Sequence, residues 1–325
     1  MLKYLLTPRF ALILVVIVAA CWASYHFGVH HVTSDESFQK APASVFGALF
    51  GHLTPAPFAH DAHAATHAGG MQYIGIPAPW LPELFTNVDG ANVGMLVLTN
   101  LQVFQIAAVL VTLIAFSGVA GYLRTGGGDV WSRMGAGFAR YIRDEMVVPV
   151  MGAEHGAHFL PYFLCVFFFV FFQNALGLLP HGATATASIA VTAAMAATTF
   201  AAMIGCGMVV QGPIAFWKNI VPHVPLPLWP LMFVVELVGL IVKPVALTIR
   251  LFANMTAGHL IVLSCMGLIM FFGQSKASVG FGSAPLAVGF GVFIMIIETF
   301  VALLQAYIFT MLSIIFVGAA IHPEH

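Results

Sequence analysis

Four charged side chains stand inside long apolar segments in the second half of the chain: Glu236, Lys243, Arg250 and Glu298. Hydrocarbon penalises a guanidinium by roughly 3 kcal/mol on insertion scales. Arginine cannot avoid this penalty by losing its proton, because its pKa lies above about 12. A permanent charge at Arg250 therefore predicts that this residue acts on a charged group that passes by, as in an ion pathway.

The polar residues around Arg250 form a stripe. Glu236, Lys243, Arg250 and Asn254 are separated by seven, seven and four residues, and each step returns to nearly the same face of an α-helix. His259 follows Arg250 at about 13 Å along the axis, and Glu236 precedes it by about 21 Å. The polar groups thus span most of a membrane thickness, with Arg250 between the two ends.

A second polar pair lies on the last apolar segment, where Glu298 and Gln305 are seven residues apart and share a face. An antiparallel hairpin would bring Glu298 to the depth of His259, and a carboxylate and an imidazole can exchange protons near neutral pH. The alternative for these residues is a structural hydrogen bond between helices. Lys243 has its own alternative, which is to pair with Glu236 or to extend toward the interface.

Metal chemistry has weaker support. The i,i+3 spacing of His155 and His158 could direct two imidazoles toward one metal ion. No third ligand is visible in the sequence, so two histidines at the membrane interface are the favoured interpretation. The histidines of the loop at 28–92 fit a solvated, low-complexity segment as well as a metal-binding tract. The four cysteines lie in apolar runs without CxxC spacing and fit core packing. We therefore expect no metal and no cofactor.

The composition indicates an integral membrane protein. Of the 325 residues, 60% are hydrophobic and 7% are charged, whereas soluble domains carry about 25% charged residues. The formal net charge of −1 argues against a nucleic-acid partner.

The lengths of the apolar runs predict the elements. Residues 10–23 fit a short anchor, a signal-type segment or a targeting region. Residues 129–148 mix charged and aromatic residues, which predicts an amphipathic helix at the membrane surface. A proline-rich loop is expected at 212–230. Membrane crossings are expected at about 93–118, 158–179 and 186–210.

The region at about 226–321 predicts a long helix hairpin. Each arm is too long for a perpendicular crossing, so tilt or a bend at Pro244 is required, with a turn at 273–283. The predicted class is an all-α integral membrane protein with five to six membrane helices and one amphipathic surface helix. We expect an N-terminal extension at 1–92 and a membrane domain at 93–325.

Basic residues in the short loops predict the orientation. They concentrate between the first two crossings and before the hairpin, whereas Lys276 stands alone on the other side. The C-terminus and the amphipathic helix should therefore face the matrix or cytoplasm, with 28–92 opposite.

The segment Arg250-Leu-Phe-Ala-Asn254-Met-Thr-Ala-Gly-His259 closely resembles the signature of subunit a of F-type ATP synthases, called subunit 6 in mitochondria. The preceding Lys243-Pro-Val-Ala-Leu-Thr-Ile and Glu236 fit the same block. The segment Asn174-Ala-Leu-Gly-Leu-Leu-Pro180 resembles the motif that closes an earlier helix in this family, and Gln305 falls where the family has a glutamine. The resemblance covers roughly 93–321.

This resemblance implies a non-catalytic proton-channel subunit of a rotary ATP synthase, in which the whole complex is the enzyme. Arg250 would separate two aqueous half-channels and face the carboxylates of a rotating ring of c subunits. The expected partners are the c-ring, the peripheral stalk and other Fo subunits, membrane lipid and protons. The residues implied along the proton path are Glu236, Asn254, His259, Glu298 and Gln305, with Lys243 and Asn174 in support.

One exchange of positions bears on the subtype. Many bacterial members have glutamate nine residues after the arginine, whereas this chain has His259 there and Glu298 on the next helix. That pattern resembles the mitochondrial form, which some bacteria share, and implies the mitochondrial inner membrane, with the bacterial plasma membrane as the alternative. Gly177 stands where some bacterial members carry an aspartate, so a role for that carboxylate does not carry over.

Two other classes of protein compete with this interpretation. A stand-alone secondary transporter is suggested by the histidines, but such folds often show internal repeats, and none is found. A purely structural membrane subunit is disfavoured by the polar stripe.

Overall fold

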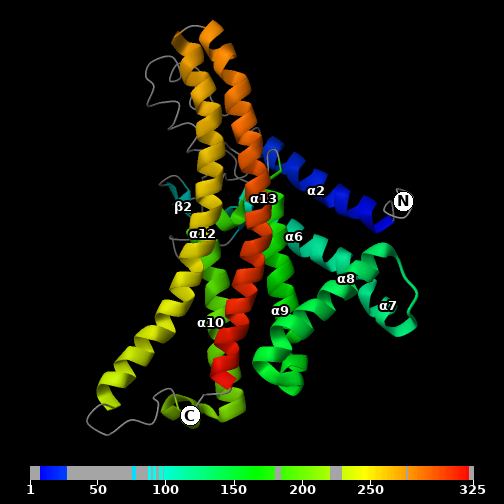
Figure 1. Cartoon of the computed structure of the whole chain (residues 1–325), viewed down its shortest axis with the longest axis vertical. Coiled ribbons are helices and arrows are strands. Elements are labelled where there is room, and N and C mark those ends of the chain that lie inside the picture. The colour runs from blue at the N-terminus through cyan, green and yellow to red at the C-terminus, as the bar shows by residue number, and fades with distance from the viewer. Residues whose placement is uncertain are drawn as a thin grey trace.

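Two very long helices, α12 (Trp229–Ser275) and α13 (Ala277–Ile321), form an antiparallel hairpin that extends past the other helices (Figure 1). At 47 and 45 residues, each is about 70 Å long, whereas the hydrocarbon core is about 30 Å thick. The computed structural model describes residues 8–27, 75–77, 87–88, 91–92, 95–97, 99–179, 184–219, 229–275 and 277–321.

The hairpin closes more tightly than the sequence predicts. The chain reverses within the turn expected at 273–283, but the expected extent is wrong, because α12 continues to Ser275 and α13 begins at Ala277. The small and polar residues of this segment stay helical, since small side chains do not by themselves end a helix. Pro244 lies inside α12, and Figure 1 shows that this helix bends along its length.

Two further long helices, α9 and α10, pack against the hairpin, and α6 packs on α9. Helix α2 packs against α6, and α9 and α10 both contact α13. The bounds are α2 Pro8–Phe27, α6 Asn100–Phe116, α7 Val119–Thr125, α8 Val130–Tyr141, η1 Ile142–Val147, α9 Val148–Gly177, η2 Ala185–Ala187, α10 Ile189–Gln211 and α11 Pro213–Asn219. Four strands of two or three residues pair antiparallel, with bounds β1 Gly75–Pro77, β2 Asn87–Val88, β3 Ala91–Asn92 and β4 Met95–Val97.

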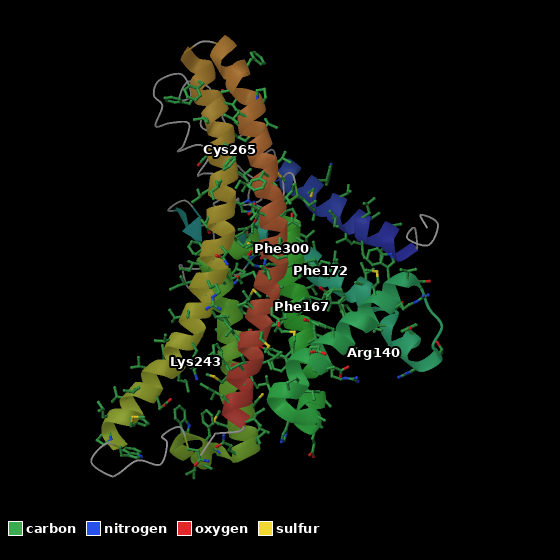
Figure 2. The ribbon with its side chains drawn as sticks, viewed as in Figure 1. Arg140, Phe167, Phe172, Lys243, Cys265 and Phe300 are labelled. Carbon is green, nitrogen blue, oxygen red and sulfur yellow. The ribbon has the colours of Figure 1, made fainter. Side chains whose placement is uncertain are left out.

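The amphipathic surface helix is confirmed as α8 and η1. Small residues on one side of α8 are buried, and Ala136 is 1% exposed. On the opposite side Met134, Phe138 and Tyr141 are exposed, and they recur at the spacing of one helix face. Figure 2 shows Arg140 at the edge of the molecule on this helix. Such a helix suits the boundary between headgroups and acyl chains.

The proline-rich loop expected at 212–230 is partly helical. Helix α11 begins at Pro213, because proline is favoured in the first turn, where its missing N–H costs nothing. Gly212 precedes it with φ +87°, a backbone conformation that L side chains rarely adopt. This glycine lets the chain turn sharply between α10 and α11.

Aromatic and aliphatic side chains fill the interior where α9, α10, α12 and α13 meet. Phe163 on α9 and Phe309 on α13 are fully buried, and Leu251 of α12 joins the same cluster. Figure 2 shows Phe167 in the middle of this region. This packing fixes the register of α13 against α9 and α12.

The predicted fold class is confirmed. Five helices in the described residues are long and apolar enough to cross a membrane. Helix α2 has a shorter apolar stretch at Ala11–Ala23.

Gly177 is predicted to be essential for the packing of the α9 end. A Cβ atom here would lie 2.8 Å from Thr184 Cα, which is backbone and cannot rotate away. We expect Gly177→Ala to destabilise the fold by about 1–3 kcal/mol, measured as a lower midpoint of thermal unfolding in detergent. Gly205→Ala on α10 is the matched control, because nothing lies within 4 Å of its Cβ position. An unchanged midpoint for Gly177→Ala would contradict the close contact.

Candidate functional site

Arg250 is exposed on α12, and no described residue forms a hydrogen bond or an ion pair with it. It lies on a strip of small exposed residues, since Ala246, Ala253 and Ala257 are all exposed at helical spacing from it. Small residues let the backbone of another helix approach closely in a membrane. The side of α12 that carries Arg250 therefore has room for a neighbouring helix.

One turn further along α12, an amide bridge joins the two arms of the hairpin. Asn254 Nδ2 donates to Gln305 Oε1 at 2.8 Å. Gln305 is 1% exposed, and its Nε2 has no hydrogen-bond acceptor among the described residues. The hairpin thus brings together two residues that the sequence placed on separate helices.

His259 and Glu298 also meet across the hairpin. His259 Nδ1 lies 3.7 Å from Glu298 Oε1, which is beyond hydrogen-bond distance but within reach of a small movement. Glu298 is 4% exposed. The other ring nitrogen of His259 contacts the hydroxyl of Thr184, just before η2. The imidazole therefore stands between a buried carboxyl group and a hydroxyl, an arrangement suited to relaying a proton.

Gly258 makes room for Glu298 beside α12. A Cβ atom at this position would lie 2.5 Å from Glu298 Oε1 and 2.7 Å from its Cδ. Any side chain larger than that of glycine would displace the carboxyl group. In the sequence, Gly258 appears only as the residue before His259 at the end of the segment that begins at Arg250. Its contact with Glu298 shows why this position needs a glycine.

Asn174 ties α9 to its neighbours on the inner side of this site. Its Nδ2 donates to the backbone oxygen of Ala302 on α13 at 3.5 Å, and Thr186 Oγ1 donates to its Oδ1 at 2.6 Å. Sequence reasoning missed Thr184 and Thr186. Threonines are common in this chain's apolar runs, so no sequence signal distinguishes these two.

Glu236 and Lys243 lie apart from the other site residues. Lys243 Nζ sits 5.6 Å from the centre of the Phe316 ring, a cation–π distance. Glu236 is half-buried, and no ion pair joins the two in the part of the chain that the structure describes. The alternative in which Lys243 pairs with Glu236 is therefore not observed.

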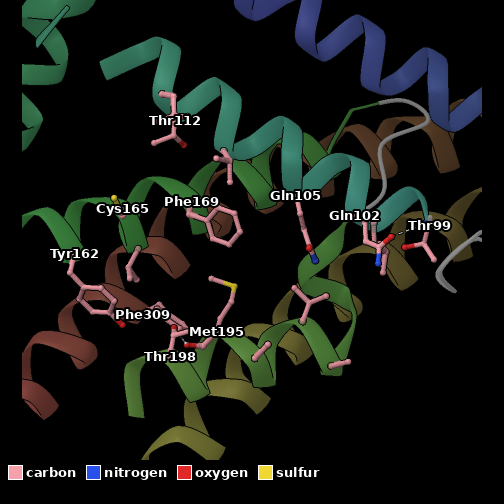
Figure 3. A pocket seen from close by; sticks show the side chains of 17 residues that line it. Thr99, Gln102, Gln105, Thr112, Tyr162, Cys165, Phe169, Met195, Thr198 and Phe309 are labelled. Carbon is pink, nitrogen blue, oxygen red and sulfur yellow. Dashed lines mark hydrogen bonds between the residues drawn. The ribbon is translucent and has the colours of Figure 1, made fainter. Parts of the chain in front are cut away.

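A groove of about 780 Å³ lies on another side of the bundle (Figure 3). It is formed by α6, α9 and α10, and Gln105, Phe169 and Met195 are among its lining residues. None of the sequence-predicted site residues lines it.

Of the two histidines considered for a metal ion, His158 has a contact within α9, where its Nδ1 lies 3.2 Å from the backbone oxygen of Glu154.

These features define a class: a helical membrane protein with an exposed arginine on one face of a long hairpin and ionisable groups between its two arms. The comparisons give the family. Residues 101–318 match the family described as ATP synthase A chain. The chain belongs to this family.

Individual relatives agree with this assignment. The chain is 47% identical over 186 residues to an ATP synthase subunit a of Anaeromyxobacter dehalogenans, covering 56% of this chain and 47% of that protein. It is 41% identical over 185 residues to that of Myxococcus xanthus, covering 57% and 59%. It is 38% identical over 264 residues to an ATP synthase subunit a 2 of Chlorobium luteolum, covering 80% and 74%.

The chain spans about half the length of the first of these curated relatives. All three relatives are bacterial. They do not support the mitochondrial inner membrane expected from the exchange of His259 and Glu298, and they fit the bacterial plasma membrane instead. The exchange is a weak guide to compartment because some bacteria share it.

The Asn254–Gln305 bridge generates a prediction about the hairpin. Asn254→Leu and Gln305→Leu should each destabilise the fold, and their combined effect should show a coupling of about 0.6 kcal/mol, up to about 1.7. The measurement is a double-mutant cycle on unfolding free energy in detergent. The control cycle combines Ser264→Ala with Gln305→Leu and should show no coupling, because the Ser264 hydroxyl donates to Leu260 in its own helix. Additive effects of the Asn254 and Gln305 variants would argue against the bridge.

Proposed function

We propose that this chain is the proton-translocating subunit a of an F-type ATP synthase. It forms two aqueous half-channels against a rotating c-ring, and Arg250 separates them. The observation that carries this proposal is the exposed Arg250 on a strip of alanines, with no ion-pair partner among the described residues. Such a charge in lipid is costly, so its counter-charge belongs on another chain that packs against this strip.

A carboxylate on a c subunit supplies that counter-charge. The carboxyl group must be neutral while it faces lipid, because an ionised group there is expensive. Beside Arg250 the ionised form is favoured, since opposite charges within about 4–6 Å stabilise each other. Arg250 therefore promotes proton release as each carboxyl group arrives, and its own charge repels a proton that would leak directly between the half-channels.

The outer path runs through the buried groups of the hairpin. Glu298 and His259 take up a proton from the periplasmic side, with Thr184 bonded to the imidazole. The Asn254–Gln305 bridge lies between this pair and Arg250. Asn174 holds the wall of the path by joining α9 to α13. These contacts support a route that reaches the ring close to Arg250.

The inner path lies on the other side of Arg250 along α12. Glu236 marks its exit toward the cytoplasm, and Lys243 lies on the same stripe with its Nζ 5.6 Å from the centre of the Phe316 ring. The membrane potential contributes about 2.3 kcal/mol per charge for each 100 mV. This free energy drives the ring in one direction because protons enter and leave by different paths.

The remaining partners follow from the surfaces of the chain. Other Fo subunits and the peripheral stalk would contact the helices away from the ring. Lipid headgroups would meet the exposed side of α8. The proposed location is the bacterial plasma membrane, with the C-terminus and α8 on its cytoplasmic side.

Arg250→Ala should abolish proton-driven ATP synthesis while the complex still assembles, because the barrier between the half-channels is lost. Synthesis and ring co-purification are measured in membranes from cells that carry the variant. Arg133→Ala, which removes an exposed arginine on α8, is the control and should synthesise ATP normally. A substrate-binding complex without a c-ring would instead indicate the stand-alone transporter class.

Glu298→Gln should slow passive proton flow through membranes stripped of the catalytic head, by about 10²-fold or more if Glu298 is a required proton carrier. Gly258→Ala should give a smaller loss, because its Cβ displaces the same carboxyl group. Gly239→Ala on the same helix is the matched control, since nothing lies within 4 Å of its Cβ position. Wild-type flow in Glu298→Gln would remove this residue from the path.

A further inference from the structure

Gln173 on α9 is a buried amide that the path described above does not use. Its side chain is 1% exposed, and neither Oε1 nor Nε2 has a hydrogen-bond partner among the described residues. Buried polar groups in folded proteins are nearly always satisfied by protein or by ordered water. Both the Oε1 and the Nε2 of Gln173 therefore have room in their hydrogen-bonding capacity for a small polar partner such as an ordered water.

The position of Gln173 in the bundle is fixed by its neighbours. It directly precedes Asn174, which bonds to the backbone oxygen of Ala302 on α13. It follows Val170 by three residues, so it lies near the same inward face of α9, and Val170 is fully buried in the core. Gln173 thus points toward the interior, at the level where α9 crosses α13.

Gln305 lies in the same layer of the bundle. It is three residues beyond Ala302 on α13, or about 4.5 Å along the axis. Its Oε1 accepts from Asn254, whereas its Nε2 has no partner among the described residues. Two buried carboxamides therefore occur at one level, Gln173 with both polar atoms unpartnered among the described residues and Gln305 with its Nε2 unpartnered, each on a helix that the Asn174 contact holds beside the other.

This layer lies where a proton relay has a gap. Glu298 and Gln305 are seven residues apart, about 10.5 Å along α13, and a direct proton transfer requires about 2.6–3.2 Å between heavy atoms. On α12, Arg250 lies one turn beyond Asn254. The amide layer therefore stands between the His259–Glu298 pair and the level of Arg250.

We propose that Gln173 and Gln305 together bind water molecules in this layer, and that Gln173 is a positioning residue of the outer proton path. The bound waters carry the proton from Glu298 toward the ring by exchange along hydrogen bonds, so that each water accepts one proton and releases another. This inference rests on the proposed function, and it adds a water site and a residue on α9 to it.

The test measures passive proton flow in membrane vesicles stripped of the catalytic head, driven by a potassium diffusion potential. Gln173→Met keeps the volume and removes the carboxamide, and it should reduce flow about fivefold, the factor expected from losing one hydrogen bond along the relay. Gln173→Asn keeps the carboxamide, and it should retain about half of the wild-type flow because water fills the missing methylene.

Thr199→Val is the matched control, because Thr199 is buried and bonded to Ser313 in a separate layer. It should leave flow unchanged. Assembly with the c-ring and the thermal midpoint are measured for every variant. Gln173→Met should keep both, since an apolar side chain leaves no polar atom unsatisfied.

Two results would overturn the inference. Wild-type flow in Gln173→Met, with Glu298→Gln still impaired, would leave the proposed function standing and remove Gln173 from the path. A loss of flow that accompanies a lower thermal midpoint, without rescue by Gln173→Asn, would make Gln173 a packing residue. If Glu298→Gln and Arg250→Ala both behave as wild type, the proposed function itself fails.

Discussion

The packing of α12 against α13 is the contact on which the site depends. It places the Asn254–Gln305 bridge and the His259–Glu298 pair at successive levels of one hairpin. A slip of one residue in either helix would rotate a polar side chain by about 100°, out of the interior and into lipid. The buried cluster of Leu251, Phe309 and their neighbours prevents this slip, because close-packed interiors tolerate few alternative registers.

The hairpin also separates two kinds of polar group. Glu298 and Gln305 face inward and are almost fully buried, whereas Arg250 faces outward. In the proposed function, the inward groups line a proton path, and their burial between the helices keeps them away from lipid. In the proposed function, the exposed arginine meets a partner carboxyl group on another chain. The small residues of α12 serve both sides. Gly258 leaves room for the carboxyl group of Glu298 on the inner side, and Ala246 and Ala253 leave room beside Arg250 on the outer side.

Much of the fold followed from the apolar runs of the sequence. The crossings at α6, α9 and α10 and the amphipathic α8 were predicted because length and periodicity are local properties. The turn at 273–283 was predicted in the right place but too long, because small polar residues there suggested a loop, whereas α12 continues to Ser275 and α13 begins at Ala277. Part of the loop at 212–230 was likewise helical, and Pro213 now explains where α11 begins.

The sequence by itself singled out the candidate site residues, since Arg250, His259 and Glu298 stand out as polar groups in apolar segments and the segment around Arg250 resembles a known signature. It also determined that the chain lies in a membrane. Only the tertiary structure decided which side chains meet: Thr184 with His259, Asn174 with Ala302, and Lys243 with Phe316 instead of Glu236. The physical reason is that spacing along one helix fixes a face, whereas contacts between helices depend on register, and register is set by the packing of the whole bundle.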